Sequence, residues 1–207
     1  MHQSSYRVVF HELLNSQHLK TKRIVITGGP SVGKTSLIEH LKSLGHPCFP
    51  EVIREFTIEE TENKTTENLK SNPIVFADDS VLFNQRLMAG RSKQYKESQQ
   101  LDAEYIFFDR GLPDVLAYMD FFDQTYDETF TKACEEMPYD MVFILPPWET
   151  IFAIDGERYE SYEELVQLHE CLTERYTHFG NSPIVVPKDT VANRVQFIVN
   201  KLAATFE

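Results

Sequence analysis

Residues 28–35 constrain the fold more than any other part of the chain. They read GGPSVGKT and match the pattern G-x-x-x-x-G-K-[ST] in full. A β-branched run at 23–27 precedes them, and residues 34–44 carry apolar side chains at helical spacing. Glycines let backbone amides turn inward around phosphate oxygens, and the start of a helix adds partial positive charge. The sequence therefore predicts a phosphate-binding loop between a buried strand and a helix.

Each part of this loop has an expected role. Lys34 is predicted to neutralise the β- and γ-phosphates, and the Thr35 hydroxyl to hold Mg²⁺. An ordinary glycine-rich turn is the alternative, but it leaves the flanking strand and helix unexplained. We expect ATP, with GTP as the other possibility, to contact the following loop residues: Gly28, Gly29, Pro30, Ser31, Val32, Gly33, Lys34, Thr35 and Ser36.

Beyond the loop, short apolar runs alternate with longer helical patterns. This alternation is typical of βαβ units and predicts an α/β fold with a parallel sheet covered on both faces. We expect further strands at 48–52, 105–108, 141–145 and 184–186, and further helices at 77–100, 114–122, 162–176 and 191–204.

The chain length of 207 residues suits one ordinary domain or two very small ones. Residues 1–22 are predicted to be an N-terminal extension, and residues 23–207 a single domain. Residues 57–73 are polar without an apolar period, which indicates a loop.

Two carboxylates follow predicted strands. Asp109 ends the apolar run YIFF, and a carboxylate there is costly unless it meets a cation such as Mg²⁺. Its alternative role is to cap a helix or to pair with Arg110. Glu51 lies at the end of the second predicted strand, where its carboxylate could take the proton of an acceptor hydroxyl. Its alternative role is that of a glutamate at a helix N-terminus.

The residue after Asp109 narrows the reaction class. Hydrolytic motors place a glutamate there, whereas this chain has Arg110. The guanine-selecting pattern N-K-x-D is also absent, because Asn63 and Lys64 are followed by two threonines. The chain therefore has a phosphate loop but lacks the further residues that are usual in a hydrolytic motor or in a switch GTPase.

Several longer polar side chains could reach a substrate. Arg158 follows the fourth predicted strand, where an arginine on a lid would add positive charge around a transferred phosphoryl group. A solvent-exposed position is the alternative for every one of these residues. The other candidates for substrate contact are Arg54, Gln85, Arg86, Arg91 and Arg110.

Composition excludes several other classes. Lys and Arg number 20 against 32 Asp and Glu, and a net charge of −12 argues against nucleic acid as a partner. The 3 cysteines lie far apart without a CxxC pair, which disfavours zinc and suits a reducing compartment. Since no stretch approaches the roughly 18 apolar residues of a membrane span, we expect a cytoplasmic protein.

Six motifs carry a resemblance to a known family. The chain resembles small P-loop ATPases known as an AAA domain, is similar to the nicotinamide-riboside-kinase domain of the NAD regulator protein, and is more distantly similar to thymidylate and deoxynucleoside kinases. The motifs are RIVITGGPSVGKTSL, FPEVIREF, FNQRL, FFDRGLPDVLAY, FILPPWETIFAIDGERYESYEEL and VVP…NRVQFIV. FDRGLPD and DGER are the more specific of them.

The resemblance implies a three-layer P-loop NTPase fold. Its five-stranded parallel sheet would have the kinase-type order 2-3-1-4-5, with a helical lid. It also implies that Asp109 and Arg110 form the D-R motif beside Mg²⁺, that Glu51 is the acidic residue after the second strand, and that Arg158 is the lid arginine. Gln85 is the nearest match to the glutamine that reads the base in deoxynucleoside kinases.

These observations favour a Mg²⁺-dependent, ATP-binding phosphotransferase that acts on a small nucleoside-like metabolite. Its partners would be a nucleoside triphosphate and a small-molecule acceptor. In this hypothesis Lys34, Glu51, Asp109 and Arg158 are the catalytic residues. The alternatives are a regulatory protein switched by ATP or GTP, which needs no acceptor base, and a simple ATPase.

Overall fold

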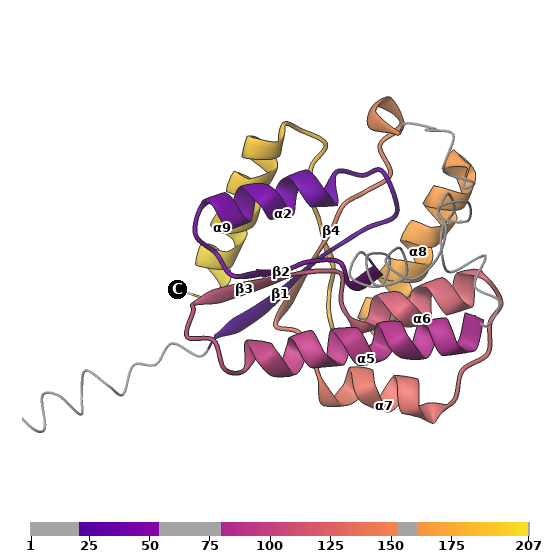
Figure 1. Cartoon of the computed structure of the whole chain (residues 1–207). Coiled ribbons are helices and arrows are strands. Elements are labelled where there is room, and N and C mark those ends of the chain that lie inside the picture. The colour runs from indigo at the N-terminus through magenta and orange to yellow at the C-terminus, as the bar shows by residue number, and fades with distance from the viewer. Residues whose placement is uncertain (1–20, 54–79, 153–160, 207) are drawn as a thin grey trace, which may run out of the picture.

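A parallel β-sheet forms the middle layer of the molecule, with helices on both faces (Figure 1). The structure is a computed structural model that describes residues 21–53, 80–152 and 161–206. The predicted loop at 57–73 and most of the predicted N-terminal extension lie outside these residues, and so does segment 153–160, where the lid is expected. No helix among the described residues is both long and apolar enough to cross a bilayer.

The five strands pair in the order β2-β3-β1-β4-β5, and every pair is parallel. This confirms the expected fold class and strand order. In the register of β1 with β3, Ile26 lies opposite Asp109, so the carboxylate flanks the strand that leads into the phosphate loop. The strands are β1 (Lys22–Thr27), β2 (Cys48–Phe49), β3 (Tyr105–Asp109), β4 (Met141–Ile144) and β5 (Ile184–Val185).

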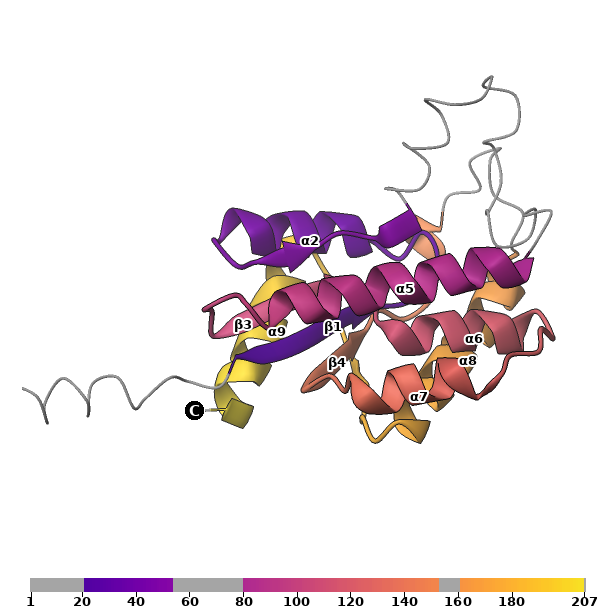
Figure 2. The same cartoon turned by 60° about the horizontal axis from the view of Figure 1, so that its bottom comes forward.

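Helices cover the two faces of the sheet unequally, as the two views show (Figures 1 and 2). One face packs against α2 (Lys34–Ser43) and α9 (Val191–Phe206). A short 3₁₀ turn at Glu149–Ile151 follows β4. The other face is covered by α5 (Ser80–Ser98), α6 (Leu112–Phe121), α7 (Glu128–Glu136) and α8 (Tyr162–His178).

Strand β1, at the centre of the sheet, shows why both faces of the sheet must be covered by helices. Ile24 and Ile26 of β1 belong to the cluster under α2 and α9, whereas Val25 belongs to the cluster on the opposite face. All three are 0% exposed. Side chains of a strand alternate between faces, so a continuous apolar run must be buried on both sides. This packing holds β1, and with it the start of the phosphate loop, in the middle of the domain.

Some element boundaries differ from the predictions. β2 ends at Phe49 rather than at residue 52, because Pro50 lacks the backbone N–H that continues a ladder. α6 begins at Leu112, ahead of the predicted start, with proline in its first turn. α7 was not predicted, since only Phe130 and Cys134 of its residues are buried. Gly45, at φ 92°, follows the end of α2 as predicted.

Shortening Leu172 should destabilise the domain, because this residue of α8 is 0% exposed in the cluster that also contains α6. We expect Leu172→Ala to lower the free energy of unfolding by about 2–5 kcal/mol, measured by urea denaturation. Val166→Ala on the same helix, at a side chain 37% exposed, is the control and should cost about 0.5 kcal/mol or less. Equal losses in the two variants would contradict the packing described here.

Candidate functional site

The phosphate loop packs tightly between the end of β4 and helix α8. A Cβ atom on Gly28 would lie 2.7 Å from the Leu145 carbonyl oxygen, and one on Gly29 would lie 2.1 Å from Leu165 Cδ1. Gly33 has φ 86° and is the N-cap residue of α2. Side chains at these positions would collide with neighbours or strain the backbone, so the motif's glycines are explained by the local geometry.

Three carbonyl groups of the loop accept hydrogen bonds from cationic side chains. The cations come from the loop itself, from the turn after β3 and from α9, so distant parts of the sequence fix the loop's shape. The bonds are Lys34 Nζ to Gly29 O (2.5 Å), Arg110 Nη1 to Gly28 O (3.1 Å) and Arg194 Nη2 to Val32 O (3.0 Å).

The Lys34 ammonium lies in a crowded, charged environment. Burial of this group, with Arg110 adding to the effect, lowers the pKa of Lys34 from its ordinary value to about 7. Asp109 and Glu51 act in the opposite direction and favour the charged form. An anionic ligand beside the ammonium would therefore bind the protonated form of Lys34 in preference to the neutral one.

Glu51 lies between two arginines. Its Oε1 accepts a hydrogen bond of 3.0 Å from Arg91 Nη2, and its Oε2 pairs with Arg110 Nε. The Glu51 side chain is 12% exposed, against 3% for Arg91 and 9% for Arg110. Each carboxylate oxygen thus has a fixed cationic neighbour, and the glutamate is held in one orientation at the end of β2.

Asp114, in the first turn of α6, is the most enclosed charge of the site and is 0% exposed. Burial alone would raise its pKa, but Arg110, Arg91 and two hydroxyl donors outweigh burial and lower the pKa of Asp114. Its four donors come from β1, from the turn after β3 and from α8. They are Thr27 Oγ1 (2.6 Å), Arg110 Nη1 (3.0 Å), Tyr176 Oη (2.5 Å) and the Gly111 backbone N–H (3.0 Å).

Asp109 and Thr35 are the residues predicted to hold Mg²⁺, and both carry the oxygen atoms that this ion prefers. Asp109 is 5% exposed at the end of β3, and its charge acts on the Lys34 ammonium. Thr35 lies in the first turn of α2. No group of three or more metal-binding side chains occurs among the described residues. Mg²⁺ beside a nucleotide needs only one or two carboxylates, since phosphates and water complete its shell, so the pair fits the ion.

The structure brings together only part of the predicted site. Lys34, Glu51 and Arg110 belong to one charged cluster with the phosphate loop. Gln85 is exposed on α5 and takes no part in that cluster. Arg54 and Arg158 lie outside the described residues, so their predicted roles stay predictions.

The sequence did not identify three residues of the charged cluster as part of the site. From the sequence, Arg91 fits a surface position as readily as a substrate contact. In the structure its side chain is buried and also donates a hydrogen bond to the Gly111 carbonyl at 2.9 Å. Asp114 follows Arg110 at the i,i+4 spacing of a helical ion pair, a signal that could have identified it. Tyr176 had no local signal, because its partner is remote in the sequence.

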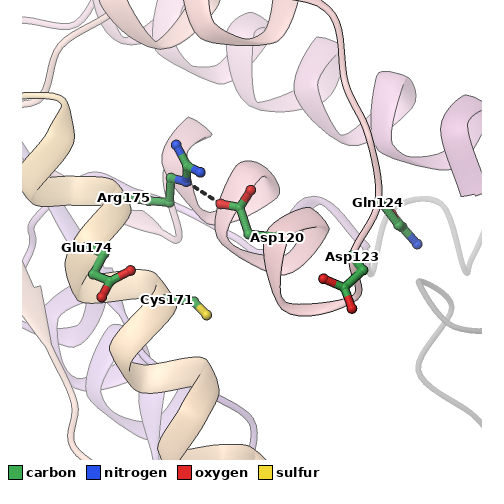
Figure 3. Close-up of a pocket in the computed structure, with 6 residues that line it drawn as sticks. All are labelled: Asp120, Asp123, Gln124, Cys171, Glu174 and Arg175. Atoms are coloured by element: carbon green, nitrogen blue, oxygen red, sulfur yellow. Dashed lines mark hydrogen bonds and ion pairs between the residues drawn. The ribbon is translucent and has the colours of Figure 1, made fainter.

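A separate polar pocket of ≈ 340 Å³ lies between the C-terminal ends of α6 and α8 (Figure 3). Arg175 pairs with Asp120 there, and none of the predicted site residues lines it. The pocket is therefore distinct from the charged cluster at the phosphate loop. Its lining residues are Asp120, Asp123, Gln124, Cys171, Glu174 and Arg175.

Comparison with protein families gives one match. A family model described as an AAA domain matches residues 23–194, which include the whole cluster described above. This confirms the family resemblance drawn from the sequence. No curated protein matches the chain significantly.

Several solved structures share the fold. Deoxyadenosine kinase from M. mycoides is 22% identical with a TM-score of 0.59, over 88% of this chain and 99% of that one. Thymidylate kinase from Candida albicans is 16% identical with a TM-score of 0.62, over 89% and 92%. The NadR protein is 20% identical with a TM-score of 0.65, over 90% of this chain and 51% of that one. At such identities the likeness concerns the fold alone.

Nucleotide affinity should fall as the pH rises above 7. The pKa of Lys34 is about 7 in the free protein, and bound phosphates would raise it by favouring the ammonium. Below pH 7 the Lys34 amine is already charged before the nucleotide binds. Above pH 7 it must take up a proton on binding, so the nucleotide affinity drops by up to about tenfold per pH unit. The measurement is calorimetry with ADP between about pH 7.5 and 9, where the phosphates have finished titrating. Repeating it in buffers of different protonation enthalpy gives the number of protons taken up on binding.

Lys34→Arg is the matched control, because a guanidinium stays charged over this whole range. The variant should bind ADP without taking up a proton. Equal proton uptake by the variant and the wild type would show that Lys34 is not the group that titrates.

Removing the charge of Asp114 should destabilise the fold near neutral pH. Asp114→Asn leaves Arg110 and Arg91 with less compensation, at an expected cost of about 3–5 kcal/mol in the free energy of unfolding. Because the pKa of Asp114 is lowered in the folded state, its contribution is complete above the unfolded pKa of about 3.9 and is lost as the pH falls through the folded value. Urea denaturation at pH 7 and at successively lower pH should show the difference shrinking.

Asp123→Asn provides the comparison, since Asp123 is exposed and asparagine tolerates its positive φ of 52°. We expect a change of about 0.5 kcal/mol or less. A loss in Asp114→Asn that does not depend on pH would argue against an ionised carboxylate at this position.

Proposed function

The chain belongs to the AAA domain family matched over residues 23–194, and from that premise we propose that it is a Mg²⁺-dependent, ATP-binding phosphotransferase for a small hydroxyl-bearing, nucleoside-like metabolite. The observation that carries the proposal is the carboxylate of Glu51, held by Arg91 and Arg110 beside the phosphate loop. A carboxylate held in this place suits the removal of a proton from an attacking hydroxyl, whereas a protein that only binds nucleotide has no need of it.

Glu51 acts on the acceptor. Its carboxylate orients the acceptor hydroxyl and takes its proton, while the acceptor oxygen bonds to the γ-phosphorus and the bond to the β,γ-bridging oxygen breaks to release ADP. Because the transition state of phosphoryl transfer is loose, the hydroxyl becomes acidic late in the reaction, and a carboxylate in ion pairs is a sufficient base. The two arginines hold Glu51 in position, which lowers the entropy to be lost on the way to the transition state.

The loop and its neighbours act on the nucleotide. Lys34 exchanges its bond to the Gly29 carbonyl for the phosphates and neutralises their charge. Thr35 and Asp109 would hold Mg²⁺, which when bound supplies further neutralisation of phosphate charge. Arg158, predicted at the lid, would add positive charge around the transferred phosphoryl group.

The acceptor class is inferred from the compounds named for the solved structures that are similar to this chain. The similar structures include enzymes named deoxyadenosine kinase and thymidylate kinase, and NadR in complex with NR. Arg54, Gln85 and Arg110 are proposed to contact the acceptor in this chain. A nucleoside or a similar metabolite with a free hydroxyl fits these polar side chains.

Replacing Glu51 should separate binding from transfer. Glu51→Gln keeps the side-chain size and removes the base, so we expect unchanged ATP affinity and transfer slower by about 100-fold or more. Lys34→Ala should lose nucleotide affinity as well as turnover. The assay incubates purified protein with labelled ATP, Mg²⁺ and a panel of nucleosides and hydroxyl-bearing vitamins, and it measures the phosphorylated product.

Glu97→Gln, on the exposed face of α5, is the matched control and should transfer at the wild-type rate. Transfer at the normal rate by Glu51→Gln would refute the base assignment. Turnover without any acceptor would instead indicate an ATPase, and tight binding with only slow hydrolysis would indicate a nucleotide-dependent regulatory protein.

A further inference from the structure

Arg194 of α9 is a buried cation that the proposed reaction does not use. It is 3% exposed, and its Nη2 donates to the Val32 carbonyl oxygen of the phosphate loop at 3.0 Å. A Cβ atom on Gly33 would lie 2.9 Å from Nη1 of the same guanidinium. The arginine is therefore pressed against the peptide bond that joins Val32 to Gly33.

The geometry of that peptide bond links Arg194 to the ligand. No peptide bond of the chain's described part is cis, and in a trans peptide the carbonyl and the next residue's N–H point to opposite sides. A donor that holds the Val32 carbonyl on one side of the peptide consequently holds the Gly33 N–H on the other side, away from Arg194. A charged donor also polarises the peptide group and makes that N–H a stronger donor.

Arg194 has no acidic partner in the part of the chain that the structure describes. No ion pair of Arg194 is found among the described residues, and its buried Nε has no hydrogen-bond partner there. The closest aromatic contact is the Trp148 ring, whose centre is 6.0 Å from the guanidinium carbon. Burial, with no acidic neighbour among the described residues, lowers the pKa of Arg194, because a buried charge is costly. A bound polyphosphate would offset this cost.

We propose that Arg194 is a positioning residue of the phosphate loop, which turns the Gly33 amide toward the ligand and adds a positive charge that no described acidic residue compensates. The inference rests on nucleotide binding as part of the proposed function, but not on transfer to an acceptor. Arg194 acts through the loop backbone, so its effect concerns the phosphates and not the base.

The test compares the binding of Mg²⁺–ATP and of inorganic tripolyphosphate by calorimetry in the full chain. Arg194→Met should weaken both ligands by the same factor of about tenfold or more, because it removes a charge-assisted hydrogen bond and a charge. Arg194→Gln keeps one donor without the charge and should lose less, and Arg194→Lys should recover most of the affinity. The amide proton of Gly33, followed by NMR, should shift on tripolyphosphate binding in the wild type and shift less in Arg194→Met.

Arg175→Met is the matched control, since Arg175 is paired with Asp120 at the pocket of Figure 3, and its affinity for both ligands should stay unchanged. A lower unfolding temperature in Arg194→Met with wild-type affinity and a wild-type Gly33 shift would assign a structural role alone and overturn the proposal. If Arg194→Met does not fold, wild-type affinity in Arg194→Gln overturns it equally. Binding in the wild type without any transfer would refute the phosphotransferase and leave the role of Arg194 standing.

Discussion

The guanidinium of Arg110 is the group on which the arrangement of the site depends. It pairs with Glu51 after β2, donates to the Gly28 carbonyl after β1 and donates to Asp114 in α6. Arg110 itself has φ 75°, a conformation that costs a non-glycine residue about 1–3 kcal/mol and persists only when its surroundings determine it. These three interactions hold Arg110 in this conformation, and they explain how a side chain immediately after β3 contacts the phosphate loop.

The charges around Arg110 alternate in sign, and this is what makes their burial tolerable. Burial alone would lower the pKa of Arg110, but Tyr118 and the surrounding carboxylates raise it well above the ordinary value. Buried ion pairs are nevertheless weak contributors to stability, since an apolar cluster of the same volume is often as stable. In the proposed reaction their value would be chemical, because fixed charges do not have to reorganise when charge develops.

The sequence sufficed for the features that depend on local pattern. The loop motif placed Lys34 and Thr35 at the start of a helix, and the apolar runs predicted the strands and the ends from which Glu51 and Asp109 project. The resemblance supplied the strand order. What stayed hidden depends on contacts between distant segments. Spacing alone could not show that Arg91 bonds to Glu51, that Tyr176 bonds to Asp114, or that Arg194 bonds to the loop.

Strand order divides the loop's surroundings into two electrically different sides. β1 is central, with β3 and β2 on one side and β4 and β5 on the other. The two buried carboxylates among the described residues, Asp109 and Asp114, come from β3 and from the helix after it, and Glu51 follows β2. The helix after β5 instead contributes Arg194, a cation without a described acidic partner. Under the proposed function, negative charge on a ligand would be favoured toward the β4 side, while Asp109 and Glu51 on the β2 side would serve a metal ion and an acceptor hydroxyl. This uneven distribution of charge follows from the strand order, because ligands of parallel sheets bind at the carboxyl ends of the strands, where these side chains lie.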